Sequence, residues 1–222
     1  MSRQTRLPRL TTSLSLVAAL IGPPLFVVVP NWLFGRSPAL PIQIVLHILF
    51  CGLAALIVWV VMRRERLPLE SIGVRRPNWS TLGSAIVLWG LTMALTPLIS
   101  QPVLDTFGKN GLEAGVHELA VLPIWFRVIA AFTGGMVEEV LYRGYAIERL
   151  SVLTGRRWVA ASASAGIFGL AHIPMWGVAF SLGADLPFGI LMTIFYLWRR
   201  DLVANMMAHG GGLAVAMLTD LP

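Results

Sequence analysis

Three short motifs in the second half of the chain carry ionisable residues that could do chemistry together. Glu138 and Glu139 lie in GGMVEEVLYR, His172 ends FGLAH, and His209 lies in NMMAHGGGL. One carboxylate and two imidazoles at a common site could hold and deprotonate a water molecule. The second imidazole could stabilise the oxyanion of a tetrahedral intermediate or protonate a leaving amine. This set of groups therefore indicates amide hydrolysis.

The first motif separates a paired glutamate from an unpaired one. Glu139 and Arg143 are four residues apart, so on a helix they share a face and can form an ion pair. A structural role in helix packing is the favoured interpretation for this pair. Glu138 points about 100° away from Glu139 and has no partner within its own segment. We expect Glu138 to act as a general base, because ionisable groups inside membrane segments are usually functional.

The two histidine motifs are weaker when each is considered alone. Phe168 and His172 share a helix face, so the ring can pack beside the imidazole and restrict its rotamers. A lone helical histidine, however, is more often a satisfied core residue. Asn205 and His209 also share a face, and the three glycines that follow would let another helix approach closely. Those glycines are equally consistent with packing alone.

Other catalytic chemistries have less support. Neither a G-x-S-x-G serine motif nor an H-E-x-x-H zinc motif occurs, and no CxxC pattern is present. The one cysteine, Cys51, lies in a different apolar segment and has no surrounding pattern typical of a nucleophile. We expect no cofactor, although a Glu/His/His set could also bind zinc, which leaves a metal site open.

The composition shows which elements must position these residues. Of 222 residues, 56% are hydrophobic and 13% are charged, whereas soluble domains carry about 25% charge. A soluble enzyme, a disordered chain and a secreted disulfide scaffold are therefore excluded. The pattern predicts an all-α, multi-pass transmembrane bundle in the cell membrane, as a single membrane domain over residues 1–222. Within it, 1–122 would hold the N-terminal spans and loops, and 123–219 the catalytic core.

About seven helices are expected, since a spanning helix needs about 20 mostly apolar residues. The expected spans are 10–34, 42–62, 81–99, 123–150, 158–172, 180–198 and 202–218. The Pro23-Pro24 pair should kink or break the first helix, and an irregular stretch is expected around 174–183. Residues 63–80 should form an interfacial segment, and residues 101–122 a solvated loop.

The basic residues predict the orientation of the bundle. With a cytoplasmic N-terminus, most of the 17 lysines and arginines fall on the cytoplasmic side, as the positive-inside rule describes. They include Arg3, Arg6 and Arg9, the arginines between 63 and 76 and between 149 and 157, and Arg199 and Arg200. The net charge of +6 is then explained by topology, and nucleic acid is not an expected partner.

The depth of the three motifs allows them to meet. From the rise per residue, Glu138, His172 and His209 lie between about 14 and 23 Å from the cytoplasmic ends of their helices. All three fall in the middle half of a hydrocarbon core about 30 Å thick. His47, near the end of its span and without such neighbours, is interpreted as a packing residue.

Taken in order, these motifs resemble those of the CPBP family, which comprises type II CAAX prenyl endopeptidases and bacteriocin-processing intramembrane proteases and is also called Abi. The matching residues are E-E-x-x-x-R at Glu138, Glu139 and Arg143, F-x-x-x-H at Phe168 and His172, and the late-helix His209. The resemblance covers residues 134–218 and implies a glutamate-dependent intramembrane endopeptidase. By position, Glu138 and His172 would activate water. Glu139 and Arg143 would hold the site together, and His209 would help to form the oxyanion hole.

One position departs from the family pattern. The third motif usually reads H-x-x-x-N or H-x-x-x-D, whereas the fourth residue after His209 is Leu213. Asn205, one turn earlier on the same side, is the candidate to replace the missing amide. Without a replacement, the chain would be a weak or inactive relative that acts as a membrane scaffold or immunity factor, which is the alternative hypothesis. A transporter ranks last, because no duplicated half or discontinuous helix pair is evident.

The expected partners are the lipid bilayer and a peptide or protein substrate near the cytoplasmic side. That substrate could be lipidated or membrane-proximal, and nothing in the sequence encodes recognition of a prenyl group.

Overall fold

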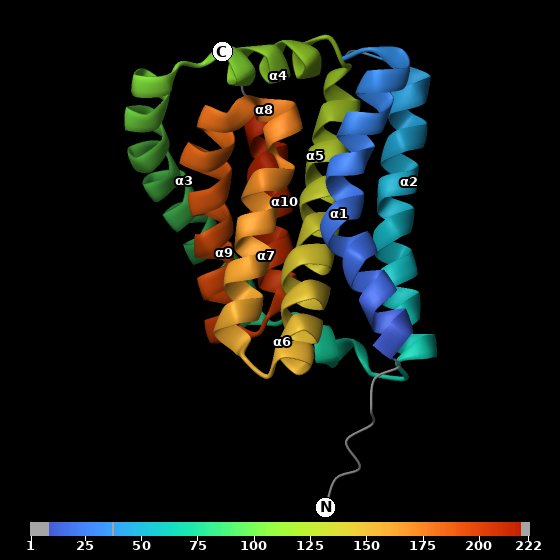
Figure 1. Ribbon diagram of the computed structural model, residues 1–222. Coiled ribbons are helices and arrows are strands. Elements are labelled where there is room, and N and C mark those ends of the chain that lie inside the picture. Colours follow the sequence, from blue (N-terminus) through green and yellow to red (C-terminus); the bar gives the residue numbers. More distant parts are fainter. Residues whose placement is uncertain (1–8, 37, 219–222) are drawn as a thin grey trace, which may run out of the picture.

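The computed structural model describes residues 9–36 and 38–218, and these residues form helices without a strand among them (Figure 1). The α-helices are α1 Arg9–Phe34, α2 Leu40–Trp59, α3 Trp79–Phe107, α4 Asn110–Ala120, α5 Ile124–Glu138, α6 Glu148–Thr154, α7 Arg157–Ala171, α8 Ile173–Phe180, α9 Leu186–Arg199 and α10 Leu202–Leu218. Three π-helical stretches continue α2, join α5 to α6 and join α8 to α9, and a 3-10 turn precedes α3. They are η1 Val60–Arg64, η3 Glu139–Ile147, η4 Ser181–Asp185 and, for the 3-10 turn, η2 Leu69–Ile72.

The expected class of fold, an all-α membrane bundle, is confirmed. Four helices in the described part of the chain are long and apolar enough to cross a membrane. They are Arg9–Phe34, Leu40–Arg64, Trp79–Phe107 and Ile173–Arg199. Many large apolar side chains along α1, α2 and α3 are exposed, as expected for helices that face lipid rather than water. In Figure 1, α1 and α2 lie side by side at one edge of the bundle and α3 lies at the opposite edge.

The prediction of a solvated loop over residues 101–122 is wrong. Helix α3 continues to Phe107 and ends at Gly108, and α4 follows, lying across one end of the bundle (Figure 1). α4 packs against α8, where an added Cβ on Gly115 would overlap the ring of Trp176. The polar residues that suggested a loop include Glu113 and His117, which lie on the exposed side of this short helix.

Of the two outcomes expected at Pro23-Pro24, a kink or a break, the break does not occur, because α1 continues through both prolines. A proline has no backbone N–H, so Pro24 cannot donate to the carbonyl of Leu20 one turn earlier. The buried hydroxyl of Tyr142 donates to that carbonyl instead, at 3.5 Å. A neighbouring helix thus satisfies the group that the proline leaves free, which is how membrane helices tolerate proline.

The segment between α2 and α3 is partly built into the bundle. Ile72 is fully buried, and the N–H of Leu202, the first residue of α10, donates to the carbonyl of Gly73 at 2.8 Å. In the same segment, Glu65 is buried and accepts a hydrogen bond from Arg149 at 2.7 Å. Arg149 therefore belongs to a buried ion pair and not to the solvated face on which the basic residues were placed.

Arg3 and Arg6, which contribute to the predicted cytoplasmic charge, lie outside the described residues. The irregular stretch expected around 174–183 is present, because Gly177 has φ 77° and ψ 168° within α8.

Helices α5 and α10 approach each other closely in the core. An added Cβ on Gly135 would lie 2.8 Å from the Cα of Gly210, and one on Gly210 would overlap the carbonyl oxygen of Phe132. Only glycine allows the two backbones to pack this closely. Because His209 directly precedes Gly210, this contact brings the histidine against the end of α5, where the glutamates lie.

Candidate active site

The three residues proposed for catalysis come together in the folded chain. Glu138 is the last residue of α5, and its Oε2 lies 3.8 Å from Nε2 of His172 and 3.7 Å from Nε2 of His209. These separations are too long for direct hydrogen bonds and are of the size that a bridging water can span. The side chains of Glu138 and His172 are 18% and 17% exposed, so the site is accessible from the surface of the protein.

His172 is oriented by the end of its own helix. It lies just beyond the last residue of α7 rather than inside the helix, and its Nδ1 is 2.7 Å from the carbonyl oxygen of Phe168. A carbonyl can only accept, so Nδ1–H is the donor in this hydrogen bond. In the neutral imidazole the lone pair is then on Nε2, which is the nitrogen that faces Glu138.

His209 is oriented by the second glutamate. Its Nδ1 lies 2.8 Å from Oε1 of Glu139, while its Nε2 faces Glu138. A carboxylate that accepts from Nδ1–H fixes the orientation and the tautomer of the ring. Glu139 therefore does more than form the ion pair with Arg143 that the spacing predicts, because it also holds one of the two histidines.

Glu139 is the centre of a fully buried polar network. Arg143 donates from Nη1 to Glu139 Oε1 at 2.9 Å and from Nη2 to the carbonyl of Gly189 at 3.2 Å. Asn205 donates from Nδ2 to Glu139 Oε2 at 3.2 Å and to the carbonyl of Met192 at 2.9 Å. Both N–H groups of Asn205 are thus engaged. The idea that Asn205 supplies the missing oxyanion-hole amide does not fit this geometry, and its contacts are those of a positioning residue.

Phe168 connects the network to His172. Its buried ring lies 4.5 Å from the imidazole of His172, the contact that the four-residue spacing predicts, and 4.1 Å from the guanidinium carbon of Arg143. An added Cβ on Gly189 would lie 2.7 Å from this ring, so α9 can approach only because that position is glycine. Leu213, the position that departs from the motif, is 37% exposed and brings no polar group to the site.

Sequence reasoning missed one carboxylate near the site, Asp185. It is the last residue of η4, it interacts electrostatically with His172 and Glu138, and its Oδ2 is buried without a hydrogen-bond partner among the described residues. The signal was present in the sequence, because Asp185 is the only charged residue in the expected span 180–198. The reasoning that singled out Glu138 applies equally to this residue.

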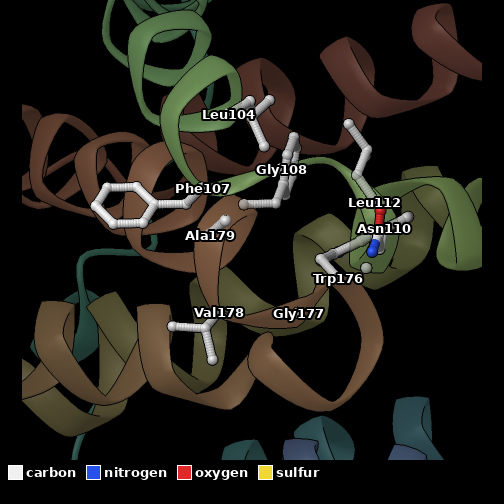
Figure 2. Close-up of a pocket in the computed structure, with 11 residues that line it drawn as sticks. Leu104, Phe107, Gly108, Asn110, Leu112, Trp176, Gly177, Val178 and Ala179 are labelled. Carbon is white, nitrogen blue, oxygen red and sulfur yellow. The ribbon is translucent and has the colours of Figure 1, made fainter.

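One pocket on the structure lies away from these residues. Figure 2 shows it between the end of α3, the start of α4 and α8, with a volume of about 210 Å³ and a lining that includes Leu104, Phe107 and Trp176. None of the three candidate catalytic residues lines it. Across the described ranges, no group of three or more His, Cys, Asp or Glu side chains is arranged to hold a metal ion.

Residues 120–213 match the protein family described as type II CAAX prenyl endopeptidase Rce1-like. This range contains every residue proposed for the site and ends at Leu213, the position that departs from the motif. No curated protein and no solved structure matches the chain.

Proposed function

Since residues 120–213 belong to the Rce1-like family of type II CAAX prenyl endopeptidases, we propose that the chain is an intramembrane endopeptidase whose attacking water is activated by Glu138 and His172. The observation that carries the proposal is the convergence of Glu138 with His172 at 3.8 Å and with His209 at 3.7 Å. These groups come from three separate helices and have no evident packing role in common.

In this proposal, water is held between Oε2 of Glu138 and Nε2 of His172. Glu138 takes one proton as general base while the water oxygen attacks the carbonyl carbon of the scissile peptide bond. The tetrahedral intermediate then collapses, the C–N bond breaks, and the proton on Glu138 passes to the leaving amine. His172 keeps the water in line, and the carboxylate of Asp185 stabilises any positive charge that His172 acquires.

His209 is proposed to stabilise the negative oxygen of the intermediate. Its Nδ1–H is bound to Glu139, so a second proton on Nε2 would make an imidazolium whose charge Glu139 offsets. That Nε2–H would then donate to the oxyanion, which gives the site a charged donor in place of the amide that is absent at Leu213. Neither step needs a metal ion, and the proposed mechanism includes none.

The proposed substrate is a peptide or protein cleaved near the cytoplasmic side of the cell membrane. The family description supports this class and a membrane setting. A lipidated substrate and a membrane-proximal one without lipid both fit the proposal.

Replacement of Glu138 by Gln tests the proposal, because glutamine keeps the size of the side chain and cannot take the proton. Comparative peptidomics of cells that carry the wild type or Glu138→Gln should show cleavage products only with the wild type. Loss of a general base typically reduces the rate by about 10²–10⁴-fold. Glu70→Gln, an exposed acid outside the site, is the matched control. Full activity of the Glu138 variant would refute the mechanism.

A second candidate function rests on Leu213. If the missing amide disables catalysis, the chain would use the same fold as a membrane scaffold or immunity factor. A Glu138→Gln variant that is folded and still supports the wild-type cellular phenotype would favour this function over proteolysis.

A further inference from the structure

A polar pocket that none of the proposed catalytic residues lines lies where α3 begins and α9 ends. It has a volume of about 280 Å³. The lining residues are Arg75, Arg76, Asn78, Ser80, Thr81, Trp198, Arg199 and Asp201. Three of them are arginines, which converge from the segment before α3 and from the last turn of α9. The positive-inside rule predicts that this end of the bundle is cytoplasmic.

The positive charge of this pocket is largely uncompensated. Arg75 and Arg76 are exposed, and neither pairs with a carboxylate within the described ranges. Arg199 donates to the hydroxyl of Ser80, but its Nε is buried without a partner in that part of the chain. A buried guanidinium N–H without an acceptor is costly, so an anion at this site would satisfy it.

The one acid in the lining offsets only part of the charge of the three arginines, and it forms no ion pair with them in the part of the chain that the structure describes. Asp201 accepts at Oδ2 from the hydroxyl of Thr81 at 2.8 Å. At Oδ1 it accepts from the backbone N–H of Ala204 at 3.2 Å, which caps the start of α10. Asp201 is buried, and it therefore ties α3 to α10 while the guanidinium groups stay available to a ligand.

An apolar surface runs from this pocket along the two helices. Trp79 and Trp198 flank the pocket and are 87% and 73% exposed, a position typical of tryptophan at a membrane interface. One and two turns further along the helices, the exposed side chains are all apolar. They are Leu82, Ile86 and Val87 on α3 and Ile194 and Ile190 on α9. A ligand with a charged head and apolar chains would match both surfaces at once.

We propose that this pocket binds the phosphate group of an anionic membrane lipid, with the acyl chains lying along the exposed faces of α3 and α9. Arginine is suited to phosphate, because its planar guanidinium can donate two parallel hydrogen bonds to two oxygens. Basic pockets between transmembrane helices on the cytoplasmic side are typical sites for acidic head groups. The site is independent of the proposed protease activity, so either proposal can fail alone.

The experiment uses the full chain purified in a neutral detergent. Short-chain phosphatidylglycerol, short-chain phosphatidylcholine and inorganic phosphate are titrated separately, and thermal unfolding is followed by tryptophan fluorescence. We expect phosphatidylglycerol to raise the melting temperature in a saturable way and phosphatidylcholine to have no such effect. Arg75→Gln/Arg76→Gln should weaken the apparent affinity for phosphatidylglycerol at least about tenfold, which corresponds to about 1.4 kcal/mol.

The control is Arg63→Gln/Arg156→Gln, which removes the same charge from two exposed arginines outside the pocket. This variant should bind phosphatidylglycerol like the wild type. The proposal is overturned if phosphatidylcholine stabilises equally, if both double variants lose affinity equally, or if inorganic phosphate alone reproduces the whole shift. The last result would identify a site for soluble phosphate. Because Arg75 and Arg76 are exposed, their replacement should not impair folding.

Discussion

Two adjacent glutamates have opposite surroundings. Glu138 is partly exposed and faces two imidazoles across gaps that a water can fill, whereas Glu139 is fully buried and accepts hydrogen bonds from Arg143, Asn205 and His209. The first arrangement suits a group that must change its protonation during a reaction. The second suits a permanent anion that holds three neighbours in place.

Glu139→Gln should therefore destabilise the protein, unlike Glu138→Gln. Removing the carboxylate charge leaves the fully buried guanidinium of Arg143 without its counter-ion, a change that typically costs about 3–5 kcal/mol. Thermal unfolding in detergent should show a clear drop in melting temperature for Glu139→Gln. The Glu138→Gln protein should unfold within a few degrees of the wild type. Equal stability of the two variants would contradict the assignment of Glu139 as the buried anchor.

Among the histidines, His172 and His209 should be required for activity and His47 should not. His47 lies on α2, where its Nε2 hydrogen-bonds to the hydroxyl of Thr133 at 2.6 Å, a contact that fits the packing role expected from sequence. His172→Ala should lower the cleavage rate at least about a hundredfold, because in the proposed mechanism His172 holds the attacking water. His47→Ala is the control, measured with the same peptide assay, and should retain most of the activity. A comparable loss in both variants would point to general destabilisation instead of catalysis.

At the scale of elements, the contact of α5 with α10 decides whether the site forms. Gly135 and Gly210 let the two backbones pack closely, and the π-helical stretch η3 begins at Glu139, one turn after Gly135. π-helical turns are frequent at functional sites. All nine residues of η3 are buried, so packing against the surrounding helices fixes the stretch that carries Glu139 and Arg143.

Gly210→Ala should disrupt the site, because Gly210 directly follows His209 in α10. Its Cβ would overlap the carbonyl of Phe132, so α10 must shift away from α5 and carry His209 with it. Overpacking of this kind typically costs about 1–3 kcal/mol, and cleavage should fall along with stability.

Gly211→Ala is the matched control for this substitution, because an added Cβ there meets nothing within 4 Å. Alanine is also the better helix former by about 1 kcal/mol, so this variant should be as stable as the wild type or more so. A stable and active Gly210→Ala protein would show that the close contact is not needed to place His209.

At the scale of the whole molecule, the basic residues predict the orientation of the bundle in the membrane. The positive-inside pattern predicts that the segment between α2 and α3 is cytoplasmic and that α4, at the other end of the bundle, faces outward. In a Cys51→Ala background, Glu70→Cys should react with a membrane-impermeant maleimide only after the cells are permeabilised. Glu113→Cys on α4 should react in intact cells. Both positions are exposed, and the opposite labelling pattern would invert the predicted topology.

Much of the candidate site could be predicted from sequence, because ionisable residues inside membrane spans are rare and usually functional. In an apolar span, a residue such as Glu138 is costly and stands out, and the spacing of Glu139 with Arg143 or Phe168 with His172 gives the contacts within one helix. The same criterion applied to span 180–198 would have found Asp185. Helix α4 was missed for the opposite reason, since its polar face resembles a solvated loop.

By itself, the sequence determined the membrane class, the all-α fold, the family motifs and the residues within each helix that share a face. These properties depend on composition and on local helical geometry. The tertiary structure alone decided that Glu138 lies close to both histidines, that the amide of Asn205 donates to Glu139, and that the hydroxyl of Tyr142 donates to the carbonyl freed by Pro24. Such contacts join helices far apart in the chain, and they depend on close packing such as the Gly135–Gly210 approach, which no spacing within a single helix can specify.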